Sequence, residues 1–221
     1  MKEKMKITLA IGMALTMLMG SVTAFADELN YEEVGCDYSV QEIVDEINEK
    51  YDINLELVET PQAKAKLAEL TEEEFVSRLE EKAAEIAKHR EESIAKFEER
   101  TGRKPSFNRE TKANKSYEIM RANPVSYSCT KTVEHVPVTV KGKTIVDTYK
   151  RFYSISSVTG KSVTSIINTT YSVEGTDYDL IDNQRTCAVS VDVIVYYYDA
   201  ELGYRASYDD VYYGEFYATE G

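Results

Sequence analysis

The sequence has little of several residue types on which common protein chemistry depends. Its 221 residues include no Trp, two His, three Cys and four Pro. So few imidazoles and thiols leave few side chains for transition-metal binding or for nucleophilic catalysis. Lys and Arg number 26 against 39 Asp and Glu, and the resulting net charge of -13 argues against non-specific nucleic-acid binding, which needs a surplus of positive charge.

Signature motifs of known reactions are lacking as well. The chain contains no Gly-rich phosphate loop, no GxSxG nucleophile elbow and no SxxK motif. Asp and Glu are so abundant that pairs occur at almost any spacing, and glycoside-hydrolase carboxylates therefore cannot be assigned. No residue pattern in the sequence identifies a catalysed reaction.

The first segment of the chain has the pattern of an export signal. Three lysines among the first six residues precede an apolar run from Ile7 to Met19, and an Ala-Phe-Ala triplet ends at Ala26, as at a signal-peptidase site. The run is shorter than the about 20 residues of a comfortable membrane span. We therefore predict a cleaved signal peptide over residues 1–26 rather than an uncleaved anchor, and a secreted, extracellular bacterial protein of Gram-positive type with no membrane span after cleavage.

Composition changes along the rest of the chain, which predicts an α+β fold. Residues 27–102 are rich in Glu, Lys and Ala, which favour helices, whereas residues 124–221 are rich in Val, Ile, Thr and Tyr, which favour strands. Only four of the 17 tyrosines come before residue 124. We expect an N-terminal helical region, a polar linker over residues 103–123, and a C-terminal antiparallel β domain.

One long helix dominates the predicted helical region. Thr71 and Glu74 have the spacing of a capping box, apolar residues follow at helical spacing, and Gly102 fits a helix end. The pattern predicts a helix over Glu72–Arg100. An alternative role for this helix is a coiled coil that forms a homodimer, but its heptad pattern is imperfect, so we favour packing against its own domain.

The second half of the sequence predicts an antiparallel β-sandwich or small barrel. Stretches of β-forming residues recur at hairpin spacing, and no helical stretch separates them. The alternating pattern is clearest near the C-terminus. We predict strands over 125–140, 144–156, 162–173, 186–198 and 204–217, a turn at 141–143, and an acidic loop at 174–183.

The three cysteines allow either a structural or a catalytic interpretation. In an exported protein, Cys129 and Cys187 from strands of the same half are candidates for a disulfide, with Cys36 left over, although the sequence does not decide which two pair. The catalytic alternative is a hydrolase that pairs Cys129 with His135, six residues later. We favour the disulfide, because no protease signature surrounds either residue.

Metal binding has weak support in the sequence. Glu85 and His89 lie one helical turn apart, but a zinc site of this kind needs a second His. Asp177, Asp179 and Asp182 partly resemble a calcium-binding spacing, which leaves calcium as a weak alternative to an ordinary acidic loop. We therefore assign no metal site and no cofactor.

Tyrosine is the residue type that most favours a function. Tyr residues crowd the last two predicted strands, and Tyr offers both a flat ring and a hydroxyl at low entropic cost, which suits recognition surfaces. The competing interpretation is cross-strand packing in a chain without Trp. The candidate ligand-binding residues are Tyr197, Tyr204, Tyr208 and Tyr212.

These observations favour a non-catalytic interaction module over an enzyme. We expect an exported protein that binds an extracellular glycan, peptide or protein through a Tyr-rich β face. Two alternatives stay open: an exported hydrolase with an unrecognised cysteine site, and an inhibitor or immunity-type protein whose acidic charge steers it to a basic target.

Overall fold

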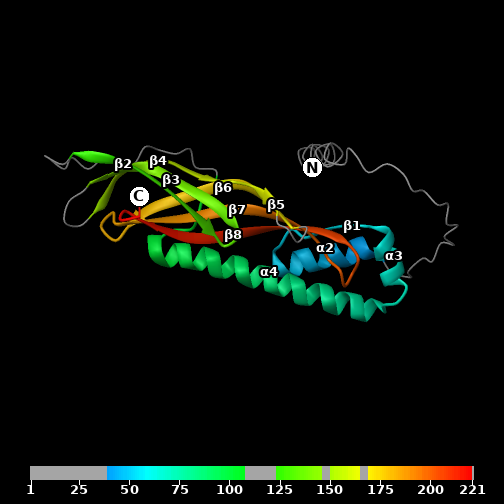
Figure 1. Ribbon diagram of the computed structural model, residues 1–221. Helices are drawn as coiled ribbons and strands as arrows, with labels where there is room; N and C mark the ends of the chain where they lie inside the picture. Colours follow the sequence, from blue (N-terminus) through cyan, green and yellow to red (C-terminus); the bar gives the residue numbers. More distant parts are fainter. Residues whose placement is uncertain (1–38, 108–122, 146–149, 165–168, 221) are drawn as a thin grey trace, which may run out of the picture. The chain divides into compact units, whose positions relative to one another are not determined.

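A computed structural model of the chain describes residues 39–107, 123–145, 150–164 and 169–220 (Figure 1). All of these residues belong to one compact unit, Gly35–Gly221. The predicted signal peptide, Cys36 and most of the predicted linker lie outside the described residues. Secretion and the division into two domains at residues 103–123 therefore stay predictions.

The helical region begins with three capped helices, α2 (Val40–Tyr51), α3 (Pro61–Leu67) and α4 (Glu72–Thr101). The capping box at the start of α4 is complete, since the Thr71 hydroxyl accepts from the Glu74 amide and the Glu74 carboxylate accepts from the Thr71 amide. Gly102 ends this helix with a φ of 74°, a conformation that glycine adopts without strain. The predicted long helix is thus confirmed to within one residue.

Two antiparallel sheets follow, which confirms the α+β class, and they do not close into a barrel. The three-stranded sheet has the order β2 (Pro124–Val133), β3 (Val136–Ile145), β4 (Arg151–Gly160). The five-stranded sheet has the order β1 (Glu56–Val58), β8 (Arg205–Tyr217), β7 (Thr186–Tyr198), β6 (Thr170–Ile181), β5 (Val163–Thr164). Valines and aromatic residues of both sheets share one buried core, as in a sandwich.

Two predicted connections are wrong. The predicted turn at 141–143 lies inside β3, and the chain reverses at Glu134 and His135 instead. Glycine is needed at position 142 because a Cβ there would come within 2.1 Å of the Ser154 carbonyl on β4. The predicted acidic loop at 174–183 is mostly strand, because β6 continues to Ile181.

The described residues contain two apolar cores, and β8 contributes to both. Tyr212 and Phe216 belong to the core between the two sheets. Ala206 belongs to a second core formed with α2, α3 and the N-terminal half of α4. Tyr208 lies between them and packs against both.

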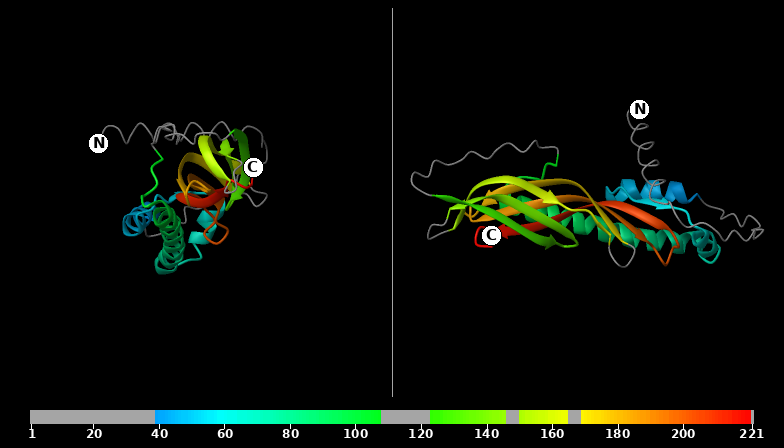
Figure 2. Two further views of the ribbon diagram at one scale, coloured as in Figure 1. Left: turned by 90° about the vertical axis from the view of Figure 1, so that its left-hand side faces the viewer. Right: turned by 45° about the horizontal axis from the view of Figure 1, so that its top comes forward.

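Helix α4 runs beside β8 (Figures 1 and 2). Side chains alternate between the faces of a strand, and α4 contacts both faces of β8: His89 meets Asp210 and Tyr212, whereas Phe97 and Arg100 meet Tyr213 and Glu215. β1 pairs only with residues 205–207 of β8, so the helix shields much of an edge that would otherwise be open to other strands.

The apolar stripe of α4 is buried within the chain. Phe75, Leu79, Ala83 and Phe97 are at most 1% exposed, so the stripe serves the internal core that we favoured over a coiled-coil seam. A homodimer contact through this helix stays a prediction. None of the helices in the described ranges is long and apolar enough to cross a membrane.

Candidate functional site

A pocket of about 260 Å³ lies where α4, the β2–β3 turn and the five-stranded sheet meet. Helix α4 contributes Ile86 and His89, with Glu85 at the exposed rim. The turn contributes Glu134 and His135. The floor combines aromatic and acidic side chains from β6 and β8, namely Tyr171, Tyr208, Asp210 and Tyr212. No Lys or Arg is among these lining residues.

His89 bridges two carboxylates that come from different elements. Its Nδ1 lies 2.9 Å from Asp210 Oδ2, and its Nε2 lies 3.0 Å from Glu134 Oε2. Asp210 is almost fully buried and also accepts a hydrogen bond from the Val211 amide through Oδ1, at 2.8 Å. The imidazole thus joins the middle of α4 to β8 and to the β2–β3 turn.

The electrostatics of this cluster favour the protonated forms of His89, Asp210 and Glu134. Burial lowers the pKa of His89, but the hydrogen bonds and charges of Asp210 and Glu134 outweigh it, so this pKa lies above its ordinary value of 6.5. Burial raises the pKa of Asp210 and that of Glu134, although the charge of His89 acts in the opposite direction on both. All three shifts stabilise the protonated forms.

Aromatic rings form the rest of the pocket wall. The His135 ring stacks on Tyr171 with a centroid distance of 5.1 Å, and it meets Tyr212 edge to face. Tyr212 also meets the His89 ring edge to face, at 5.7 Å. Flat rings beside carboxylates are suited to a ligand that has both an apolar body and a polar or positively charged end.

The four tyrosines that the sequence singled out divide between this pocket and the cores. Tyr208 and Tyr212 line the pocket, although Tyr212 is only 3% exposed. Tyr204 is buried in the helical core, and Tyr197 packs against that core and meets Tyr208 edge to face. Burial raises the pKa of Tyr197 to about 12 and also raises those of Tyr208 and Tyr212 above their ordinary value. The set therefore forms no continuous outer face.

The predicted disulfide between Cys129 and Cys187 is not formed, and both are free thiols. They lie on strands of different sheets, β2 and β7. Cys187 lies in the core between the sheets, whereas Cys129 is only partly buried and packs against that core. Burial raises the pKa of the Cys187 thiol well above its ordinary value. A thiol in that state is a poor nucleophile.

The geometry also gives little support to a Cys129–His135 pair. Cys129 pairs with Val140, four residues before the end of β2, which is roughly 13 Å along an extended strand. His135 lies beyond that end and packs on Tyr171 and Tyr212. The proton transfer between a thiol and an imidazole needs a distance of about 3 Å.

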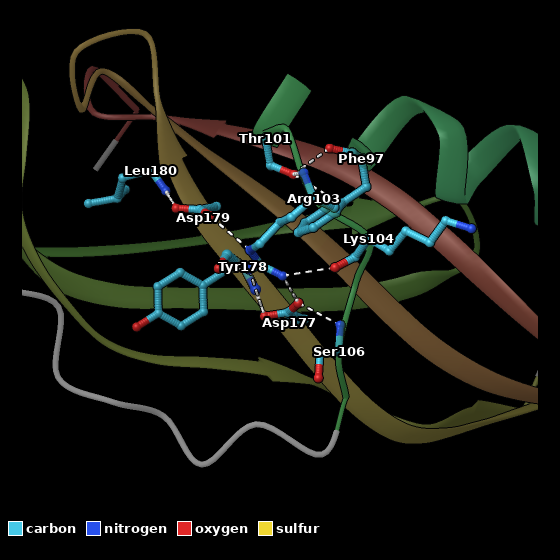
Figure 3. Close-up of polar contacts among 9 residues, drawn as sticks. All are labelled: Phe97, Thr101, Arg103, Lys104, Ser106, Asp177, Tyr178, Asp179 and Leu180. Atoms are coloured by element: carbon cyan, nitrogen blue, oxygen red, sulfur yellow. Dashed lines mark hydrogen bonds and ion pairs between the residues drawn. The ribbon is translucent and has the colours of Figure 1, made fainter. Parts of the chain in front are cut away.

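The three aspartates that suggested calcium are paired with arginines. Figure 3 shows two of them, Asp177 and Asp179, beside Arg103. The Arg103 guanidinium donates to both oxygens of Asp177 and to Asp179, and the Ser106 amide also donates to Asp177. Asp182 accepts from Arg100 at 2.8 Å. These contacts fasten the end of α4 to β6. Within the described ranges, no group of three or more His, Cys, Asp or Glu side chains is placed to hold a metal ion.

Sequence reasoning missed the centre of the pocket. The sequence does not single out Glu134, Asp210 or Tyr171, and the spacing of His89 from Glu85 points to a zinc ligand rather than to this cluster. A helix residue and a turn residue 45 positions later leave no local signal of their contact. The one available clue was the density of Tyr, which drew attention to Tyr208 and Tyr212.

Comparisons with known proteins add no information about this site. No protein-family model, curated protein or solved structure matches this chain.

Proposed function

We propose that this protein is an exported, non-catalytic interaction module that binds an extracellular partner through the pocket between α4, the β2–β3 turn and β8. The observation that carries the proposal is the convergence of Tyr171, Tyr208 and Tyr212 with carboxylates in one pocket of about 260 Å³. Such a pocket accommodates one side chain of a peptide or protein, or part of a sugar ring.

The bonding of His89 supports a binding role over a catalytic one. A catalytic imidazole uses one ring nitrogen for orientation and the other for the reacting group. Both ring nitrogens of His89 face protein carboxylates at 2.9–3.0 Å. In this arrangement neither ring nitrogen is free to contact a substrate.

The charge of the pocket favours a partner with a basic group. Glu85, Glu134 and Asp210 line it together with only two imidazoles, and cations are attracted both to carboxylates and to Tyr faces. This observation also supports the second candidate, an inhibitor or immunity-type protein directed to a basic target. Binding that weakens steeply with added salt would favour that candidate.

A binding screen with matched variants tests the proposal. The full chain is screened against a random-peptide display library and a glycan array, and ligands are re-tested with Tyr171→Ala. We expect an affinity loss of at least about tenfold, the cost of losing an aromatic anchor. Tyr198→Ala is the control, because Tyr198 is 41% exposed on β7 and lies outside the pocket.

Two outcomes would contradict the proposal. One is the absence of any peptide or glycan ligand, and the other is a set of ligands whose affinity Tyr171→Ala leaves unchanged. Hydrolysis of a substrate that stops on thiol blocking would instead support the cysteine hydrolase.

A further inference from the structure

We propose that His89 is a proton-controlled latch on this pocket. With both ring nitrogens protonated, His89 ties Glu134 of the β2–β3 turn to Asp210 of β8. When the ring loses one proton to solvent, it keeps Asp210 and releases Glu134, which opens the rim of the pocket between α4 and the turn. That the latch controls ligand binding rests on the proposed function. The latch itself, the contact between His89 and Glu134, can be observed without any ligand.

Loss of one proton from the His89 ring must break one of its two hydrogen bonds, because the neutral ring has one N–H donor fewer. The doubly protonated ring has two N–H donors, and the two carboxylates accept from them at 2.9 and 3.0 Å. The neutral ring has a single N–H and one lone pair. That lone pair faces a carboxylate oxygen at hydrogen-bond distance, which is repulsive.

Burial decides which contact is lost. The Asp210 side chain is only 5% exposed and is held by the Val211 amide, so water can replace the imidazole there less well. The Glu134 side chain is 31% exposed and sits in a turn, where water replaces the imidazole as its partner. The neutral ring therefore keeps its proton on Nδ1, toward Asp210, and Glu134 is the group that moves.

The charged and titratable groups around the ring all influence the protonation equilibrium of His89. Glu134 and His135 face the ring from the turn, and Asp210, Tyr208 and Tyr212 face it from β8. Tyr171 approaches from β6, and α4 itself contributes Glu85 at the rim. Arg90, whose guanidinium donates to the Asp52 carbonyl, places positive charge near Asp210. The carboxylates of Asp210 and Glu134 outweigh the burial of the ring and hold the pKa of His89 above its ordinary value.

An NMR titration of the full chain tests the latch directly. The chain has only two histidines, so His135→Gln leaves the His89 imidazole as a single signal. We expect His89 to titrate above 6.5, the amide signals of residues 134 and 135 to shift with the same midpoint, and the ring nitrogen shifts above that midpoint to identify the Nδ1–H form.

Two variants separate the contact from simple charge. Glu134→Gln should move the His89 midpoint down, toward the ordinary value, and remove the linked shift of the turn amides. Glu85→Gln removes one negative charge from the same pocket without a bond to the ring, so it should lower the midpoint less and preserve the linked shift.

The latch is refuted if the turn amides do not follow His89, if the neutral ring carries its proton on Nε2, or if Glu85→Gln matches Glu134→Gln. A missing ligand in the binding screen would leave all three readouts unaffected, so failure of the latch and failure of the proposed function are distinguishable.

Discussion

At the level of single residues, Arg103 connects the end of α4 to the five-stranded sheet. Its guanidinium donates to Asp177, to Asp179 and to the Tyr178 carbonyl, all on β6 (Figure 3). Asp177 is 5% exposed, and a buried carboxylate without a partner is costly. The planar, five-donor geometry of Arg suits this arrangement, which a Lys cannot reproduce.

We predict that Arg103→Ala lowers the free energy of unfolding by about 2–3 kcal/mol, because it leaves the buried Asp177 carboxylate without its cation. Urea unfolding followed by circular dichroism measures this change. Lys104→Ala is the matched control, since it removes a neighbouring basic residue that forms no ion pair with another described residue; its cost should stay within about 0.5 kcal/mol. Equal costs for the two variants would contradict this role of Arg103.

At the scale of elements, the sequence predicted those helices and strands whose signals are local. The capping box and Gly102 fixed α4 to within one residue, and the strict alternation of Val in 186–198 fixed β7. The wrong connections arose where tertiary contacts override local preference. Gly142 serves a close approach between β3 and β4 rather than a turn, and Asp177 is tolerated in a strand because Arg103 neutralises it.

The candidate site was predictable only in part for the same reason. Alternation placed Tyr208 and Tyr212 on one face of β8, but it did not indicate which layers cover that face. The three-stranded sheet and α4 cover most of it and leave the pocket between them. Which tyrosines are buried therefore depends on packing that no local pattern records.

Two glycines with the same backbone angle allow a controlled test of element packing. Gly102 and Gly203 both have φ of 74°, but a Cβ at 102 meets nothing within 4 Å, whereas one at 203 would lie 2.8 Å from the Ala63 amide nitrogen at the start of α3. We predict that Gly102→Ala costs about 1 kcal/mol of stability and that Gly203→Ala costs roughly 3 kcal/mol or more.

Thermal unfolding of the two variants beside the parent chain measures the difference. Both substitutions impose the same left-handed strain, so any excess at position 203 reports the contact between α3 and the β7–β8 turn. A Gly203→Ala variant as stable as Gly102→Ala would show that this contact is loose.

For the whole molecule, the protonation of His89, Glu134 and Asp210 links pH to stability. The pKa values of all three groups are raised in the folded state. A raised pKa means that the folded chain binds more protons than the unfolded chain, so stability falls as pH rises through that range. For His89 the contribution is fully present below 6.5 and is lost as pH rises through the higher folded value.

We predict that the free energy of unfolding decreases as pH rises above 6.5, the ordinary pKa of His, and that His89→Gln flattens this dependence. Urea titrations at a series of pH values measure both slopes. A parent slope that rises with pH, or one that His89→Gln leaves unchanged, would contradict the prediction.

The sharing of β8 between two cores determines how this chain can fold. Ala206 completes the core around the helices, and Tyr212 and Phe216 complete the core between the sheets. Apart from β7, the partners of β8 lie far back in the sequence, as the contact between Arg100 and Glu215 illustrates. Such high contact order slows folding, and neither core closes until residues 205–217 have been synthesised. Both cores are therefore completed only after β8 has been synthesised, and loss of residues 205–217 would remove part of both cores at once.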